Sequence, residues 1–334
     1  MARSYPTDTQ PRGADTSAGG VARPAEGQSQ GLGQGQSQGQ GLAAAFGAFL
    51  LWGLTPVYFP LLGTTDAVEI LAHRILWTAL MLGGLVLALG RGAEVLAILR
   101  QGVRGLRLYA LTTLLVSTNW VVFIYAIFSG HLLQGSLGYY INPLVHVLLG
   151  VMFLSERMTR LQAAAVALAG AGVAVLVVAE GVVPWISFIL AFSFGFYALI
   201  RKKKQVDPLV GLLVEASLLS PLCLGFVAWL AIQGTGSFGP AAIGGDGLAA
   251  SLLLVGTGLV TGAPLLLFMI GARTLKLATI GLMQYLAPTL QFIIAVTLFG
   301  ETLTTAHLVT FACIWTGLAL YTAEAYAGRA RPMG

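Results

Sequence analysis

The sequence predicts an all-α, polytopic membrane protein with ten transmembrane helices arranged as two inverted five-helix repeats. Three observations predict this fold class. The 334 residues are 57% hydrophobic and only 9% charged, whereas soluble domains contain about 25% charged residues. A pattern of Tyr, Pro and Glu occurs twice, 145 positions apart without a gap. Of the 18 Lys and Arg residues, all except Arg74 fall in segments assigned to one side of the membrane.

Ten apolar stretches are each near the roughly 20 residues that cross ~30 Å of hydrocarbon as a helix. In chain order they are 42–62, 67–89, 107–128, 132–154, 161–180, 183–200, 208–232, 249–272, 277–299 and 306–326. Helices are expected because lipid requires each backbone polar group to be satisfied within the segment. We therefore divide the apolar region into a first repeat, 41–180, and a second repeat, 181–326.

The two ends of the chain are predicted to be tails. Residues 1–40 are rich in Gly, Gln and Ser, and they lack the apolar core and cleavage site of a signal peptide. We expect a disordered cytoplasmic tail there and a short cytoplasmic tail at 327–334.

Charge placement predicts the orientation. The Lys and Arg residues other than Arg74 lie in the two tails and in the loops after spans 2, 4, 6 and 8. The positive-inside rule therefore puts both termini in the cytoplasm, with the protein in the cytoplasmic membrane. Because five helices per repeat is an odd number, the copies have opposite orientations. The basic excess suits anionic lipid headgroups, so the lipid bilayer is a sufficient partner and no nucleic acid is implied.

The repeated pattern lies in the fourth and ninth spans. It comprises Tyr140, Pro143 and Glu156 in LGYYINPLVHVLLGVMFLSERM, then Tyr285, Pro288 and Glu301 in LMQYLAPTLQFIIAVTLFGETL. Each proline lacks an amide donor and frees a carbonyl four residues earlier, at Tyr139 and Gln284. A mid-helix proline in each copy of a duplicated bundle is typical of a transporter site. A packing kink without ligand contact is the alternative.

Polar and aromatic side chains gather near these prolines. They are Tyr139, Tyr140, Asn142 and His146 in the first copy, Gln284, Tyr285, Thr289 and Gln291 in the second, Asn119 and Trp120 on the third span, and Trp52, Thr55 and Tyr58 on the first. Together they predict an aromatic, mostly neutral cavity for a small molecule. Each Trp or Tyr taken singly is also common in a helix core or at an interface.

Ionisable residues inside the spans form two groups. Glu69, His73 and Arg74 lie within six positions of the second span, and Glu215 lies in the seventh. A membrane Arg costs on the order of 2.5 to 3.5 kcal/mol, so Arg74 should face the bundle interior or water and have a partner. We interpret the groups as outer and inner gates or proton-responsive sites. Snorkelling to the interface and static pairing with a neighbouring helix stay as alternatives.

Other special residues favour structural roles. Glu156 and Glu301 are expected at helix ends, where Thr159 and Gln162 fit a capping box. The small residues Ala169, Gly170 and Gly172 suit close helix packing. Cys223 and Cys313 lie inside apolar spans without metal-ligand spacing, so we predict no disulfide, metal or other cofactor.

At these residues the chain resembles the RarD group of EamA-type permeases, within the drug/metabolite transporter superfamily; the group is commonly labelled chloramphenicol-sensitive protein. The resemblance covers roughly 42–326. It rests on EILAHRILW (69–77), NWVVFIYAI (119–127), SLGYYINPLVHVLLGVMFLSER (136–157), LVEASLLSPL (213–222) and QYLAPTLQFIIAVTLFGE (284–301). It implies ten helices in two inverted EamA units, a central cavity and transport of small organic molecules, usually outward. The family often has Glu where this chain has Gln134 and Asn where it has His146, so no carboxylate role is carried over at 134.

We therefore predict a secondary transporter, an exporter of small organic metabolites or drugs, that works by alternating access and is not an enzyme. A Walker A sequence is absent, which argues against direct ATP drive. Proton coupling through Glu69, His73 or Glu215, exchange and facilitated diffusion all stay open, as do a monomer and a homodimer. The competing classes are a membrane scaffold or regulator and a lipid-modifying enzyme, and the scattered polar groups lack the nucleophile and base that an enzyme needs.

Overall fold

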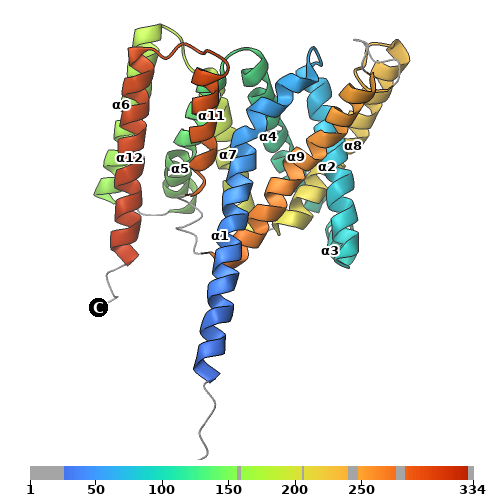
Figure 1. Ribbon diagram of the computed structural model, residues 1–334, viewed down its shortest axis with the longest axis horizontal. Helices are drawn as coiled ribbons and strands as arrows, with labels where there is room; N and C mark the ends of the chain where they lie inside the picture. The colour runs from blue at the N-terminus through green and yellow to red at the C-terminus, as the bar shows by residue number, and fades with distance from the viewer. Residues whose placement is uncertain (1–25, 156–158, 205–206, 240–246, 276–282, 330–334) are drawn as a thin grey trace, which may run out of the picture.

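The structure, a computed structural model, describes residues 26–155, 159–204, 207–239, 247–275 and 283–329. Within those ranges it contains helices and no strand (Figure 1). The helices are α1 (Glu26–Tyr58), the 3-10 helix η1 (Phe59–Leu62), α2 (Ala67–Ala88), α3 (Gly92–Leu99), α4 (Gly102–Phe128), α5 (Leu132–Leu154), α6 (Arg160–Glu180), α7 (Trp185–Lys204), α8 (Pro208–Gln233), α9 (Gly247–Thr274), α11 (Leu286–Thr297) and α12 (Thr305–Arg329).

Seven of the described helices are long and apolar enough to cross a membrane, and α7, α11 and α12 supply shorter apolar segments. Each of the ten apolar stretches predicted from the sequence overlaps one of these helices. The prediction of an all-α, polytopic membrane protein is confirmed. The ten-span inverted repeat and the division into two repeats stay predictions.

The helices α1, α3 and α11 need comment beside the predicted spans. Helix α1 begins at Glu26, inside the segment predicted as a tail, and residues 1–25 lie outside the described residues. The short helix α3 was not predicted, because eight residues are too few for a span and were counted as loop. Helix α11 begins at Leu286, inside the span predicted over 277–299, and the predicted start of that span lies outside the described residues.

Proline is compatible with the start of α11. Pro288 lies in the first turn of α11, where amides lack intrahelical partners and a missing donor costs little. Gln284 and Tyr285 form a turn just before it. Pro143, in contrast, lies inside the continuous helix α5. The two prolines match in sequence, yet only the second one coincides with a helix start.

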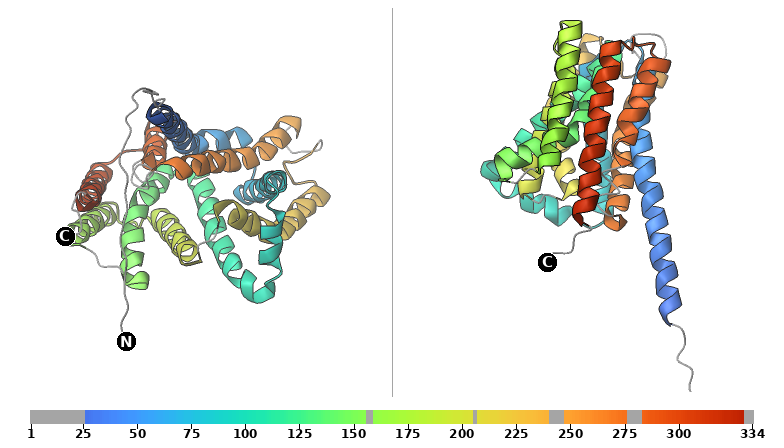
Figure 2. Two further views of the ribbon diagram at one scale, coloured as in Figure 1. Left: turned by 90° about the horizontal axis from the view of Figure 1, so that it is seen from below. Right: turned by 90° about the vertical axis from the view of Figure 1, so that its left-hand side faces the viewer.

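The helix contacts repeat when the helices of the two halves are exchanged. Helix α1 packs on α9 as α7 packs on α4, α1 packs on α11 as α7 packs on α5, and α2 packs on α9 as α8 packs on α4. The pairs α2–α8, α5–α11 and α6–α12 exchange into themselves. Helices α6 and α12 stand side by side at one edge of the bundle (Figures 1 and 2). A two-fold relation between the halves, as the sequence predicts, would give this pattern.

Small residues bring α6 and α12 together. A Cβ atom on Gly172 would lie 2.8 Å from the Cβ of Cys313, and one on Gly317, 145 positions later, would lie 2.8 Å from the carbonyl oxygen of Ala165. Thr310 also donates a hydrogen bond to the carbonyl of Gly172 at 2.7 Å. Close packing and interhelical hydrogen bonds drive such contacts in lipid. Gly170 meets nothing within 4 Å, so only part of the predicted small-residue stripe lies in this interface.

Polar side chains cap several helix starts. Thr159 and Gln162 form the predicted capping box of α6. Glu301 accepts hydrogen bonds from the backbone amides of Leu132 and Leu133, at 2.5 and 2.8 Å, and so caps α5 from the other half of the chain. Glu301 therefore has a structural role at a helix end, as the sequence predicts. Glu156 lies outside the described residues.

Contacts between loops agree with the predicted sidedness. Glu301 reaches the start of α5, and Thr304 donates to the carboxylate of Glu180 at the end of α6. Arg91, after α2, pairs with Asp207 at the start of α8. Each contact joins segments that the charge pattern assigns to the same side. The described end of α12 and the beginning of α1 also lie at one end of the bundle (Figure 1).

Candidate functional site

A cavity of about 220 Å³ lies between helices of both halves of the chain. Its walls come from α1, α2, α4, α5, α7 and α11 with the preceding turn. The lining residues are Phe49, Trp52, Thr55, Arg74, Asn119, Trp120, Phe123, Tyr139, Asn142, His146, Phe194, Gln284, Ala287, Pro288 and Gln291. Eleven residues that the sequence predicted for the cavity or its gates are among them: Trp52, Thr55, Arg74, Asn119, Trp120, Tyr139, Asn142, His146, Gln284, Pro288 and Gln291.

Many lining positions are related by the same separation as the repeated motif. Four pairs of lining residues are 145 positions apart: Phe49 and Phe194, Tyr139 and Gln284, Asn142 and Ala287, and His146 and Gln291. The spacing that defines the repeat therefore also defines facing walls of the cavity. Such pairing is expected when a cavity lies on a two-fold relation between the halves.

Prolines expose backbone acceptors near the cavity. Pro56, inside α1, cannot donate to the carbonyl of Trp52, and the side-chain amide of Gln291 donates to that carbonyl at 3.3 Å instead. Pro143 likewise frees the carbonyl of Tyr139. Both Trp52 and Tyr139 line the cavity. The prolines thus place hydrogen-bonding backbone where it lines a hollow within the protein.

Arg74 is the only Lys or Arg among the lining residues. Its side chain is only 6% exposed, its Nε donates to Thr261 Oγ1 at 2.8 Å, and its guanidinium lies 4.4 Å from the ring centre of Trp120. Its Nη1 has no hydrogen-bond partner among the described residues. Arg74 therefore faces the bundle interior, as predicted, with a hydroxyl and an aromatic ring as neighbours.

Asn119 ties three helices together beside Arg74. Its Nδ2 donates to the carbonyl of Leu190 at 3.0 Å and to Ser193 Oγ at 3.2 Å, and its Oδ1 accepts from the Tyr139 hydroxyl at 3.2 Å. This network fixes α4 and α5 against α7. Asn119 therefore positions the wall of the cavity, since both ends of its amide are already bonded.

Two other amides are less satisfied. Asn142 and Gln291 are 7% and 3% exposed, and neither Asn142 Oδ1 nor Gln291 Oε1 has a hydrogen-bond partner in the described residues. Leaving a buried acceptor unpaired costs about 1 to 3 kcal/mol, so such groups call for an explanation. A bound solute with a hydrogen-bond donor would supply one.

The repeated tyrosines and Pro143 do not line this cavity. Tyr140 donates or accepts a 2.6 Å hydrogen bond with Thr289 Oγ1 and stacks on Tyr285 with ring centres 6.4 Å apart. Tyr140 also contacts the rings of Phe311 and Trp315 on α12. The two tyrosines thus join α5, α11 and α12 in an aromatic cluster behind the cavity wall.

Glu69 and His73 face away from Arg74. The carboxylate of Glu69 accepts from the Ser237 amide at 2.7 Å and from its hydroxyl at 3.1 Å. His73 stacks on Phe238 with ring centres 4.8 Å apart, and its Nδ1 accepts from Trp77 Nε1 at 3.3 Å. The predicted trio therefore separates: one member lines the cavity and two hold the segment that follows α8.

Glu215 forms a buried ion pair. Its carboxylate is 2.9 Å from Arg201 Nη1 and accepts from the Tyr197 hydroxyl at 3.1 Å. Glu215 lies near the start of α8, whereas Glu69 contacts Ser237 just beyond the end of α8. The 18 residues from Glu215 to Gln233 span about 27 Å of helix. The two carboxylates therefore lie at opposite ends of α8.

Known proteins identify the family. Residues 39–178 match the EamA-like transporter family. An uncharacterized transporter from Vibrio cholerae is 42% identical and is aligned over 84% of this chain and 91% of its own length. Proteins named RarD from Streptomyces exfoliatus and Escherichia coli are 41% and 39% identical, over 85% and 84% of this chain and 88% and 93% of theirs. The chain belongs to the RarD group of EamA-type transporters.

A solved crystal structure supports the same fold. It is 21% identical to this RarD-group chain, with a TM-score of 0.54, and the match covers 86% of this chain and 98% of that one. At this identity the likeness concerns the fold alone. Family membership and the apolar helices together establish a multi-pass membrane protein of a transporter family.

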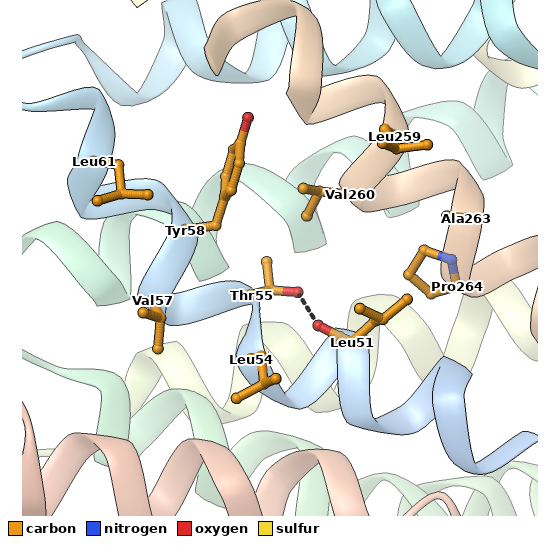
Figure 3. A pocket seen from close by; sticks show the side chains of 10 residues that line it. All are labelled: Leu51, Leu54, Thr55, Val57, Tyr58, Leu61, Leu259, Val260, Ala263 and Pro264. Atoms are coloured by element: carbon orange, nitrogen blue, oxygen red, sulfur yellow. Dashed lines mark hydrogen bonds between the residues drawn. The ribbon is translucent and has the colours of Figure 1, made fainter.

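A second hollow in this RarD-group chain, of about 470 Å³, lies between α1 and α9 (Figure 3). Its lining residues are Leu51, Leu54, Thr55, Val57, Tyr58, Leu61, Leu259, Val260, Ala263 and Pro264. The two hydroxyls are both bonded, from Thr55 to the Leu51 carbonyl at 3.1 Å and from Tyr58 to the Leu253 carbonyl at 2.5 Å. This groove is larger than the central cavity, yet it offers apolar surface only. The polar chemistry is concentrated in the central cavity.

Phe49, Phe123 and Phe194 line the cavity but were not among the predicted site residues. Single phenylalanines in apolar spans carry no signal of their own. The separation of 145 between Phe49 and Phe194 is the signal that would have found two of them.

At the end of the bundle that carries Arg91, that side chain holds Asp207 at 3.1 Å and Glu94 at 2.7 Å. Partial burial raises the pKa of Asp207, but hydrogen bonds from the Val210 amide and from Arg91 outweigh it and hold this pKa below its usual value. The hydrogen bond from Arg91 likewise lowers the pKa of Glu94. These contacts fasten the segment after α2 to the start of α8.

Proposed function

We propose that the protein is a secondary transporter of small organic solutes, an exporter working by alternating access in the cytoplasmic membrane. Its ten spans form two inverted repeats, with both termini in the cytoplasm. The observation that carries this proposal is the central cavity, whose walls are positions 145 apart and which holds buried, unpaired polar atoms. A site between two related bundles is the arrangement on which alternating access depends.

The contacts at the two ends of α8 are the proposed gates. Glu69 with Ser237 closes one end through hydrogen bonds, and Glu215 with Arg201 closes the other through an ion pair. The cavity residue Arg74 lies one turn of α2 beyond Glu69, on the way into the bundle. Opening one end requires its contact to break while the other persists. Proton coupling through Glu69, His73 or Glu215 is the energetic variant that a pH gradient tests.

Inversion is testable by labelling single cysteines from outside the cell. After Cys223 and Cys313 are replaced, His131→Cys at the start of α5 and Leu298→Cys at the end of α11 should both react with a membrane-impermeant maleimide. Arg100→Cys, after α3, should react only once the membrane is broken. Reaction of His131→Cys without Leu298→Cys would mean that α5 and α11 run parallel, and the inverted repeat would be wrong.

Transport is tested by radiolabelled counterflow in proteoliposomes, across a panel of small organic acids, amines and neutral metabolites. For any solute that exchanges, Arg74→Ala and Gln291→Leu should slow exchange by about 10-fold or more, because each removes a hydrogen-bonding group from the cavity. Leu222→Ala, at a highly exposed position of α8, is the control and should leave exchange unchanged. Equal effects of all three variants on exchange would mean that the cavity is not part of the transport pathway.

Repeating the assay across an imposed pH gradient addresses coupling. Proton coupling predicts flux that follows the gradient and that loses this dependence in Glu215→Gln or Glu69→Gln. Flux that ignores the gradient would leave exchange or facilitated diffusion as the mechanism.

A further inference from the structure

We propose that the central cavity binds a small monoanionic carboxylate with an apolar or aromatic body and a hydroxyl or N–H donor. The inference rests on the transport function proposed above and adds the chemical class of the solute.

The first argument is the unpaired edge of Arg74. Thr261 occupies Nε and Trp120 covers one face of the guanidinium, and Nη1 is a buried donor without a hydrogen-bond partner among the described residues. Within those residues no acidic side chain forms a salt bridge with Arg74. A buried guanidinium without a counter-ion is expensive, and a planar carboxylate matches its donor geometry.

The second argument is the charge of the lining. Arg74 is the one cation and there is no Asp or Glu among the residues that line the cavity. A ligand with one negative charge neutralises such a site, whereas a neutral or cationic solute leaves Arg74 unpaired. The charge therefore selects a monoanion over an amine of similar shape.

The third argument is the interrupted helix α11. Its first turn carries Ala287 and Pro288, both of which line the cavity, and α11 is 12 residues long. The unbonded amides and the dipole of a helix start attract negative charge. In transporters, half-helix starts commonly face the anionic part of a substrate. Arg74 and the start of α11 thus favour the same sign of charge from different elements.

The remaining groups define the rest of the ligand. Asn142 Oδ1 and Gln291 Oε1 are buried acceptors without partners, which calls for a donor on the solute. Aromatic rings supply the rest of the wall, among them Trp52, Phe123 and Phe194. The volume of about 220 Å³ is below the roughly 300 to 1,000 Å³ of pockets for drug-sized ligands, which favours a small metabolite.

Calorimetric titration of the purified protein in detergent tests this with three probes that share one ring: 4-hydroxyphenylacetate, 4-hydroxyphenylacetamide and tyramine. The carboxylate should bind about 10- to 100-fold more tightly than the amide, because a hydrogen bond to a charged group replaces one to a neutral group. Tyramine should bind most weakly. Arg74→Gln should equalise the affinities for the carboxylate and the amide, while Arg91→Gln, at a partly exposed arginine that does not line the cavity, should keep the wild-type preference.

Two further variants keep the test decisive if Arg74→Gln does not fold. Arg74→Lys keeps the positive charge but loses the planar pair of guanidinium donors. It should therefore weaken carboxylate binding while the three probes keep the same ranking by affinity. Asn142→Leu should weaken 4-hydroxyphenylacetate and leave phenylacetate, which has no donor on its ring, unchanged. Absence of a carboxylate preference in the wild type, or its survival in Arg74→Gln, would overturn the inference, as would full carboxylate affinity in Arg74→Lys.

Binding and transport can fail separately. Arg74-dependent carboxylate binding without counterflow of carboxylates would support the inference and count against the transport role of this cavity. Counterflow of a neutral or cationic solute without carboxylate binding would support transport and overturn the inference.

Discussion

The ion pair of Arg201 and Glu215 provides the most quantitative prediction. Its two side chains are 14% and 1% exposed, and the charged atoms are 2.9 Å apart. Removing one partner of a buried pair typically costs about 3 to 5 kcal/mol, because the other charge is left without compensation. In Arg201→Met the nearly inaccessible carboxylate of Glu215 keeps neutral hydroxyl donors, among them that of Tyr197 at 3.1 Å, and loses its counter-ion. We therefore expect a loss of about 3 kcal/mol.

The reverse substitution should cost less. In Glu215→Met, Arg201 is left with partial access to solvent and lies 5.3 Å from the ring centre of Tyr197. We expect a loss of about 1 to 2 kcal/mol there, and the double variant should lie within about 1 kcal/mol of the wild type, since an apolar pair of similar volume replaces a buried ion pair at little cost. The single effects should thus be non-additive by about 3 kcal/mol.

The assay is reversible unfolding of the four proteins in mixed detergent micelles, with the free energy of unfolding as the readout. Arg91→Met is the matched control, because Arg91 and Asp207 form an exposed pair that should be worth at most about 1 kcal/mol. Additive losses in the double variant would refute the reasoning. So would an Arg201→Met effect no larger than that of Arg91→Met.

Three further predictions concern packing, capping and pH. Gly172→Ala should destabilise the protein by about 1 to 3 kcal/mol, because the new Cβ atom clashes with Cys313. Gly170→Ala should be neutral or stabilising by up to about 1 kcal/mol. Thermal unfolding of the two variants tests this, and the opposite order of stability would contradict the α6–α12 interface. Glu301→Ala should cost about 1 to 2 kcal/mol and speed amide exchange at the start of α5, measured by hydrogen exchange, with Glu301→Gln intermediate. The pKa of Asp207 is lower in the folded state than its usual value of 3.8, so the ionised carboxylate stabilises the folded protein at pH values above 3.8. This contribution disappears as the pH falls through the folded-state pKa. The difference in stability between the wild type and Asp207→Asn should therefore shrink on acidification, and a difference that grew would contradict this reasoning.

The sequence predicted much of the fold because its signals are local. Apolar runs of membrane length, the Thr159 capping box and a proline in the fourth span each act within one helix turn or one span. Helix α3 was missed because its eight residues are apolar yet short. Pro143 and Pro288 have the same sequence context but different helical surroundings, since the first lies inside α5 and the second in the first turn of α11.

The site was predicted in part, and helical phase explains the division. Tyr139, Asn142 and His146 are spaced by three and four residues, so they share one face of α5, and that face lines the cavity. Tyr140 and Pro143 lie one position further round and face the packed side. The repeated sequence pattern includes residues of both the cavity face and the packed face of α5. Only the spacing of the polar residues tells the two faces apart. The partner of Arg74, Thr261, lies 187 positions away and is set by tertiary packing.

The two-fold pattern of helix contacts gives Arg74 a special place. A contact that exchanges into itself, such as α2 with α8 or α5 with α11, must straddle the axis of a two-fold relation. Arg74 projects from α2, whereas α8, the corresponding helix of the second half, carries no Lys or Arg. The charge is therefore present once, while the phenylalanines at 49 and 194 are present as a pair. In the proposed inverted repeat, the paired cavity walls would exchange positions between the state open at one end and the state open at the other. The single charge of Arg74 on α2 would line the cavity in both states. A solute held by Arg74 would then keep its anchor throughout the cycle, and the affinity difference that drives release would have to come from the paired walls.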